Sequence, residues 1–187
     1  MKLITIQNSA ILNDLKRTGK YIADFSRVSE NLVKPYHRMS DYYGWNTCPV
    51  FCAPVNECVC FYGCKPDDGV AIQLEVPEGI VRLQYYYDWT DLIYFTEFPN
   101  EFADTFNLAI VPNIDAFAKQ VLDFSYQGGY NIVQATLPYI ESEWIEKISY
   151  QPNNIYTVYN YNSLLEELHM YTPCEAFDRK TSRTQNR

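Results

Sequence analysis

Hydrophobic residues recur every three to four positions in some parts of the chain and every second position in others. The first spacing is typical of a helix with one buried face, and the second is typical of a half-buried strand. Helical stripes, with capping residues and terminal glycines, are found at residues 10–18, 35–43, 114–124 and 164–172, with a shorter stripe at residues 100–107. Because not all of these stripes are strong enough to predict a helix of their own, we expect three to four helices in all.

Strand-like runs make up most of the remaining chain. They are found at residues 3–6, 48–55, 58–64, 70–76, 80–87, 131–137, 144–150 and 155–161. The polar pair Asn56-Glu57 separates the second run from the third, which predicts a hairpin. The pattern predicts an α+β fold with a mainly antiparallel sheet, as a single domain over residues 1–173 followed by a polar tail over residues 174–187.

The composition is typical of one folded domain of ordinary size. The chain has 187 residues, of which 47% are hydrophobic, and this excludes global disorder. Aromatic residues make up 16% and include 17 tyrosines, and such residues favour strands and large half-polar contact surfaces. We therefore expect an aromatic-rich sheet whose core needs neither disulfides nor a metal ion.

The chain is acidic, with a formal net charge of −8. Its last nine residues hold four basic residues and no acids, so the rest of the chain carries −12. Such a body repels phosphate backbones, which disfavours direct nucleic-acid binding. It accommodates a partner protein with a basic surface more easily, although the charge can also serve solubility alone.

The N-terminal segment lacks the apolar core and cleavage site of a signal peptide. No stretch of the sequence is long and apolar enough to span a membrane. We therefore expect a cytoplasmic protein whose six cysteines stay reduced.

Five of the cysteines lie within 17 residues, from Cys48 to Cys64. The pairs Cys48/Cys52 and Cys60/Cys64 each enclose three residues, a spacing that a structural zinc site permits. The alternative is that these cysteines are small buried hydrophobic residues in a reduced protein. We favour the alternative, because the only feature that suggests zinc is the number of cysteines close together in this segment.

The sequence contains no phosphate-binding loop, because the pair Gly128-Gly129 lacks the residues and spacing of the known glycine-rich motifs. No metalloprotease or nucleophile-elbow motif occurs either. Two carboxylates, Glu141 and Glu143, follow a predicted strand two residues apart. Extended backbone would point both to one side, where paired carboxylates can serve acid–base chemistry or stabilise a cation. The alternative is a solvated turn.

One aromatic run, over residues 85–89, has the sequence Tyr-Tyr-Tyr-Asp-Trp. Its rings could stack on a base or on a nicotinamide ring. Strand alternation would instead bury half of the run in the core and expose the rest, and core packing is the interpretation that we favour.

Three segments, taken in order, resemble a family of uncharacterised bacterial domains that open with a strand of the Leu-Trp-Thr-Ile-Gln type. The segments are Leu3-Ile4-Thr5-Ile6-Gln7 before a helix, Leu74-Glu75-Val76-Pro77 with the later Tyr87-Asp88-Trp89, and Val133-Gln134-Ala135-Thr136 with Glu143-Trp144-Ile145. The resemblance covers residues 1–150. The layout is also distantly similar to DNA-targeting ADP-ribosyltransferase toxins, in which a His-x-Thr first strand leads into a helix ending at Gly and a late strand carries the catalytic Glu.

The resemblance to the toxins implies an ADP-ribosyltransferase-like fold and NAD as the cofactor. It implies that Thr5 and Gln7 bind the nicotinamide side of NAD. It also implies that Tyr87 or Trp89 stacks on a ring of the ligand and that Gln134 lies on the late strand of the site.

The chain departs from the toxin pattern at two positions. Leu3 stands in place of the histidine, and Thr136 stands where the pattern places the glutamate. A threonine cannot supply the negative charge that stabilises an oxocarbenium-like transition state as nicotinamide leaves. Either Glu141 or Glu143 substitutes for it from the following turn, or the domain has kept the scaffold without the activity.

Two functional hypotheses follow from these features. In the first, the protein is an ADP-ribosyltransferase-like domain that binds NAD or another nucleotide, with Glu143 or Glu141 as the catalytic carboxylate. In the second, it is a non-enzymatic acidic binding protein, for example a regulator or inhibitor of a defence-system protein, that uses its charge against a basic partner.

Overall fold

The computed structural model describes residues 1–54, 58–59, 69–125, 132–150, 159–160 and 169–177. None of the helices within these ranges has the length and the apolar character needed to cross a membrane. The predicted strand over residues 155–161 and the predicted helix over residues 164–172 lie largely outside the described residues.

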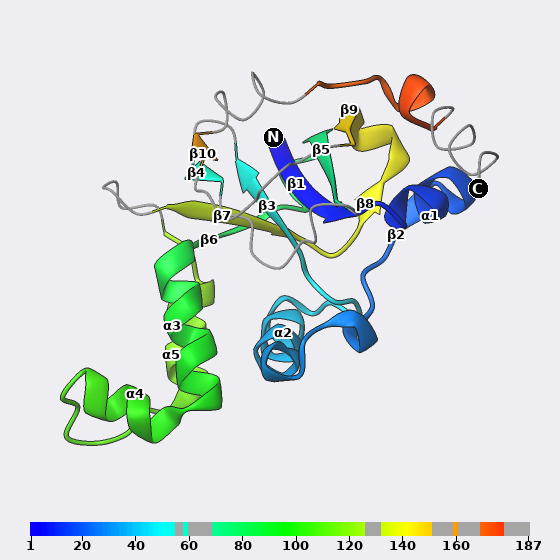
Figure 1. Cartoon of the computed structure of the whole chain (residues 1–187). Helices are drawn as coiled ribbons and strands as arrows, with labels where there is room; N and C mark the ends of the chain where they lie inside the picture. Colours follow the sequence, from blue (N-terminus) through cyan, green and yellow to red (C-terminus); the bar gives the residue numbers. More distant parts are fainter. Residues whose placement is uncertain (55–57, 60–68, 126–131, 151–158, 161–168, 178–187) are drawn as a thin grey trace.

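A six-stranded sheet forms the centre of the molecule (Figure 1), in the order β6-β7-β3-β1-β5-β9. Its strands are β1 (Lys2–Asn8), β3 (Val50–Pro54), β5 (Gly69–Glu75), β6 (Arg82–Tyr85), β7 (Val133–Leu137) and β9 (Ile145–Ser149). Every neighbouring pair in this sheet is antiparallel. Two smaller pairings join β2 (Lys20–Tyr21) to β8 (Ile140–Glu141) and β4 (Cys58–Val59) to β10 (Tyr159–Asn160). The predicted α+β fold with a mainly antiparallel sheet is confirmed.

The described residues contain more helices than the three to four that the sequence pattern predicted. The α-helices are α1 (Ile11–Thr18), α2 (Glu30–Tyr43), α3 (Tyr86–Glu97), α4 (Pro99–Thr105) and α5 (Ile114–Leu122), with a further helical turn at residues 173–177. Two short 3-10 turns are η1 (Phe25–Arg27) and η3 (Ser142–Trp144). The sequence pattern indicated neither α3 nor the helical turn at residues 173–177.

The sheet has a buried core on each face. On one face, α1 packs its apolar stripe against residues such as Leu3, Ile72 and Leu74 of the central strands. On the other face lie α2, α3 and α5, whose cluster includes Met39 and Leu92. Figure 1 shows these three helices together on one side of the sheet, with α4 at the far end of α3.

The prediction of one strand over residues 80–87 was wrong in its second half. The β6–β7 ladder ends at the pair Tyr85–Val133, because β7 begins at Val133. Tyr86 then donates a hydrogen bond from its backbone N–H to the carbonyl of Ile132 and starts α3. Trp89 and Phe95 are both buried on this helix, Trp89 against Phe51 of β3 and Phe95 against Phe117 of α5.

The predicted hairpin between residues 48–55 and 58–64 is not formed by β3 and β4. The antiparallel partners of β3 are β1 and β7, which occupy both of its edges. The described part of the second run, β4, pairs instead with β10. Since a central strand has no free edge, β3 cannot also pair with the segment that follows it.

Two predicted boundaries also differ from the structure. Helix α2 begins at Glu30, so Pro35 lies inside it rather than in its first turn. At the other end of the chain, Ala176 is fully buried in the core on the α1 side, and Tyr150 donates a hydrogen bond from its hydroxyl to the Ala176 carbonyl. Packing against the core therefore continues to Ala176, beyond residue 173, where the predicted domain ends.

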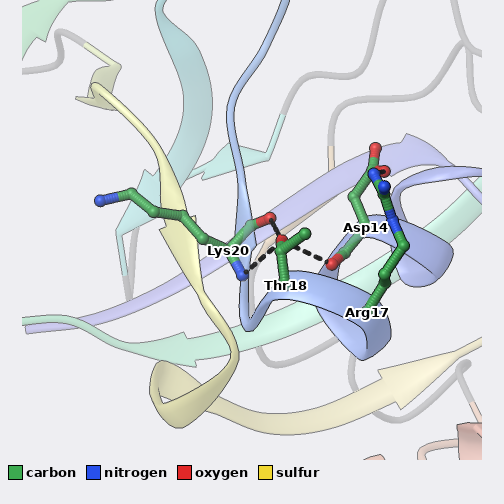
Figure 2. A network of polar contacts seen from close by, with 4 residues as sticks. All are labelled: Asp14, Arg17, Thr18 and Lys20. Atoms are coloured by element: carbon green, nitrogen blue, oxygen red, sulfur yellow. Dashed lines mark hydrogen bonds and ion pairs between the residues drawn. The ribbon is translucent and has the colours of Figure 1, made fainter.

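The connection from α1 to β2 is held by a local polar network (Figure 2). Gly19 ends α1 with φ 72°. The Thr18 hydroxyl lies 2.8 Å from the Asp14 carbonyl oxygen and 2.7 Å from that of Lys20, and it accepts a hydrogen bond from the Lys20 N–H. Arg17 pairs with the Asp14 carboxylate at 3.1 Å. This network sets the direction in which the chain leaves α1 and enters β2, which pairs with β8.

Candidate functional site

A cleft of about 560 Å³ opens where the ends of three central strands meet η1, α2 and α3. Its volume lies within the range of small-molecule sites, which is about 300–1,000 Å³. The strands contribute the end of β1 and the beginnings of β3 and β7. Side chains that line it and could contact a ligand include Gln7, Arg27, Tyr36, Phe51, Trp89 and Gln134.

Aromatic rings form one wall of the cleft. The ring centroids of Tyr36 and Phe51 lie 5.1 Å apart, and the Trp89 ring lies 5.6 Å from Phe51 and 6.0 Å from Tyr36. All three rings belong to or pack against the core formed by α2, α3 and α5, so their positions are fixed by packing. Such a wall offers flat apolar surface to a planar ligand.

Gln7 at the end of β1 also lines the cleft, and strand alternation places its side chain on the face of the sheet opposite to Phe51. Gln7 donates a hydrogen bond from its side-chain amide to the Thr5 hydroxyl at 2.8 Å. Thr5 in turn donates to the carbonyl of Phe51 on the neighbouring strand at 2.7 Å. These two bonds orient the Gln7 amide, and Thr5 itself is fully buried.

Gln134 is the least satisfied polar group of the cleft. The residue is 9% exposed, and its side-chain Nε2 is buried without a hydrogen-bond partner among the residues that the structure describes. Gln84 lies directly opposite on β6, fully buried, and its Nε2 also has no partner. A buried amide without a partner costs free energy. Because Nε2 has almost no exposed surface, a ligand acceptor would satisfy this donor only after the Gln134 amide turned into the cleft.

The mouth of the cleft carries one acidic and one basic side chain from η1. Asp24 accepts a hydrogen bond from the backbone N–H of Ser26, and this bond lowers the pKa of the Asp24 carboxyl below its ordinary value. The Arg27 guanidinium lies on the same turn and can pair with a phosphate or carboxylate. The Phe25 ring stacks on the His37 ring of α2, with 3.7 Å between the ring centroids. This contact anchors the turn beside the cleft.

Three of the five residues predicted to bind a cofactor line this one cleft. Gln7, Trp89 and Gln134 come from distant parts of the sequence and are brought together by β1, α3 and β7. Thr5 is fully buried and accepts the hydrogen bond from Gln7. Tyr87 is 55% exposed on α3 and does not line the cleft, and its neighbour Tyr86 does so instead.

The two candidate carboxylates lie elsewhere. Glu141 is on β8, where its carboxylate pairs with Lys20 at 3.3 Å. Lys20 also lies over the Tyr139 ring, 3.2 Å from its centroid. Glu143 is exposed and lines a separate shallow hollow near the end of β5. Neither carboxylate is among the described residues that line the cleft.

Thr136, which occupies the position of the catalytic glutamate in the toxin resemblance, is fully buried on β7. Its hydroxyl lies 3.4 Å from the Arg82 carbonyl oxygen and 3.4 Å from Oε1 of Gln84. It shares a strand face with Gln134 by alternation, but it does not line the cleft.

Two of the four candidate zinc ligands, Cys48 and Cys52, are buried thiols beside the cleft. The other two, Cys60 and Cys64, lie outside the described residues. Within the ranges that the structure covers, no three Cys, His, Asp or Glu side chains are grouped so that they could hold a metal ion. Burial raises the pKa of both described thiols to about 12.

These pKa values predict that Cys48 and Cys52 resist alkylation in the folded protein. At pH 8 the raised pKa lowers the thiolate fraction by roughly 1,000-fold, and the higher nucleophilicity of a more basic thiolate offsets part of this. We expect iodoacetamide to modify both at least about 30-fold more slowly than the exposed Cys174. Peptide mapping over time would measure this. Equal rates in the native protein, or unequal rates in denaturant, would contradict it.

Several residues of the cleft had no clear signal in the sequence. Tyr36 belongs to the apolar stripe predicted for the second helix, so it was assigned only to the core. Asp24 and Arg27 lie on a 3-10 turn without hydrophobic periodicity. Phe51 lies on a strand that was predicted correctly, but its position beside Trp89 depends on how α3 crosses the sheet.

Comparison with protein-family models found no matching family, and comparisons with curated proteins and with solved structures found no significant match. The cleft itself is therefore the basis for a functional proposal.

Proposed function

We propose that this protein is an ADP-ribosyltransferase-like domain whose cleft binds NAD or a related nucleotide without transferring ADP-ribose through Glu141 or Glu143. The observation that carries the proposal is the convergence of Gln7, Trp89 and Gln134 in one cleft of suitable volume. These residues come from the three segments on which the resemblance to the family of uncharacterised bacterial domains rests.

The chemistry of the cleft suits such a ligand. Aromatic rings of nucleotides favour flat apolar surfaces such as the wall of Tyr36, Phe51 and Trp89. The unpartnered Gln134 amide can donate to a carboxamide or ring acceptor of the ligand. Arg27 at the mouth can pair with a phosphate group.

The distribution of carboxylates favours binding over transfer. Cleavage of the nicotinamide–ribose bond needs a negative charge close to the developing oxocarbenium ion. Among the described residues that line the cleft, Asp24 is the one acid, and its carboxylate caps η1. Glu141 is paired with Lys20 and Glu143 lies in a separate hollow.

The experiment that tests the proposal is a calorimetric titration of the protein with NAD, run beside an assay for released nicotinamide. We expect saturable binding with one site and no release of nicotinamide. A Glu143→Gln variant should bind NAD with unchanged affinity, because Glu143 lies outside the cleft.

The outcomes separate the two halves of the proposal. Absence of saturable binding by NAD, ADP-ribose and nicotinamide mononucleotide would reject the nucleotide site. Release of nicotinamide that is lost in the Glu143→Gln variant, with the fold intact by circular dichroism, would instead establish the transferase hypothesis with Glu143 as the catalytic carboxylate.

A further inference from the structure

An exposed apolar surface lies at the end of the molecule farthest from the sheet. It is formed by α4 and the segment that follows it, residues 98–111, which we call the α4 arm (Figure 1). Its exposed apolar side chains are Phe98, Phe106, Leu108, Ile110 and Val111, with exposed fractions from 39% to 81%. Five such side chains within 14 residues are typical of an interaction surface rather than of scattered surface residues.

The arm is a packed structure that presents these side chains in fixed positions. The Phe102 ring lies under the arm and contacts Phe95 of α3 at 4.8 Å, Phe106 at 4.6 Å and Phe117 of α5 at 5.5 Å, measured between ring centroids. These contacts fasten α4 to the two helices beside it. The part of the surface formed by α4 and Phe106 therefore needs little ordering when a partner binds.

The turn after α4 sets the direction of the exposed segment. Asn107 has φ 52°, in the left-handed region that asparagine tolerates better than most residues. Its N–H donates to the Asp104 carbonyl at 3.2 Å, and the N–H of Leu108 donates to the Ala103 carbonyl at 2.8 Å. This pair of bonds is a Schellman motif, which ends the helix and holds Leu108 at the start of the exposed segment.

The charge of the arm is entirely negative. Between residues 98 and 118 the sequence has no Lys, Arg or His, and its acids are Glu101, Asp104 and Asp115. Asp115 pairs with Arg38 of α2. Glu101 and Asp104 form no ion pair with any other residue that the structure describes. An apolar surface flanked by these acids is complementary to an apolar surface flanked by Lys or Arg.

We propose that the α4 arm is a docking surface for a basic amphipathic segment of a partner protein, most simply a helix with one apolar and one cationic face. The apolar side chains of the arm contact the apolar face, and Glu101 and Asp104 pair with the cationic residues at its edge. A second copy of this chain would bring the same acids together, and an anionic membrane would repel them. The inference is independent of the nucleotide cleft.

The test uses a fluorescent helical peptide with leucines on one face and lysines on the other, titrated with the full chain and followed by anisotropy. We expect saturable binding that weakens as salt rises from about 50 mM to about 500 mM, because the exposed charges are screened. A matched peptide with glutamates in place of the lysines should bind at least about tenfold more weakly.

Two double variants locate the surface. Leu108→Ser with Ile110→Ser removes apolar contacts, and Glu101→Gln with Asp104→Asn removes charge; each should weaken binding by about tenfold or more. Ile22→Ser, which changes an exposed isoleucine elsewhere, is the matched control and should leave affinity unchanged.

Other outcomes overturn the proposal. These are absence of binding, equal binding of the acidic peptide, or equal weakening by the control. Self-association of the wild type, seen by sedimentation and abolished by Leu108→Ser with Ile110→Ser, would assign the arm to a second copy of the chain instead.

Discussion

Replacing Leu92 by alanine is expected to lower the free energy of unfolding by about 3 kcal/mol, within the range of 2–5 kcal/mol typical of a fully buried leucine. Leu92 is fully buried on α3, in the cluster that includes Met39 of α2 and Leu122 of α5. The substitution leaves a cavity at the point where three helices meet. Since the free energy of unfolding of a domain is only about 5–15 kcal/mol, this loss is a large part of the total stability.

Urea denaturation at equilibrium would measure this change, and the melting temperature should fall by roughly 6–12 °C. The matched control is Leu108→Ala on the α4 arm, where the side chain is 39% exposed and the expected loss is below about 1 kcal/mol. Equal losses in the two variants would mean that α3 does not form part of the core as described here.

The same helix shows where sequence reasoning about the fold was limited. The run that begins α3 is aromatic and follows a real strand, and both features favour continued extended structure. The helix has no side chain that caps its N-terminus. What ends the strand is the start of β7 at Val133, a partner that lies 48 positions from Tyr85 and that no local pattern can reveal.

Elements with a strong local signal were predicted more accurately. The first helix was recognised from the stripe of Ile11, Leu12 and Leu15, and Gly19 ends it in the left-handed conformation. Asn113 was recognised as the cap of α5, where its side chain accepts hydrogen bonds from two backbone N–H groups. In both cases the residues that determine the element lie within it or next to it.

The candidate site was predictable only where it depends on strands. Gln7 and Gln134 were selected from strand segments, and both line the cleft, although β3 separates their two strands in the sheet. Glu141 and Glu143 were selected from their spacing and as substitutes for the glutamate of the toxin pattern. Their positions depend on the turn at η3 and on the pairing of β8 with β2, which direct them away from the cleft.

The substitution Gln134→Leu is expected to weaken NAD binding by about 10- to 100-fold while leaving the protein as stable as before or more stable by about 1 kcal/mol. Leucine has nearly the volume of glutamine and removes a buried Nε2 that has no hydrogen-bond partner in the free protein. Removing an unsatisfied donor relieves a desolvation cost. In the complex, the acceptor of the ligand would lose its partner, which costs about 1–3 kcal/mol of binding free energy.

In this variant the affinity for NAD should fall while the stability is unchanged or rises. This combination distinguishes a glutamine that binds a ligand from one that serves the fold. Calorimetric titration with NAD and urea denaturation of the same preparation would measure both quantities. Gln73→Leu, on β5 outside the cleft, is the matched control and should leave the affinity for NAD unchanged. A loss of stability in Gln134→Leu with unchanged affinity would show that the amide serves the fold, because a structural hydrogen bond is lost on substitution whereas an unpartnered donor is not.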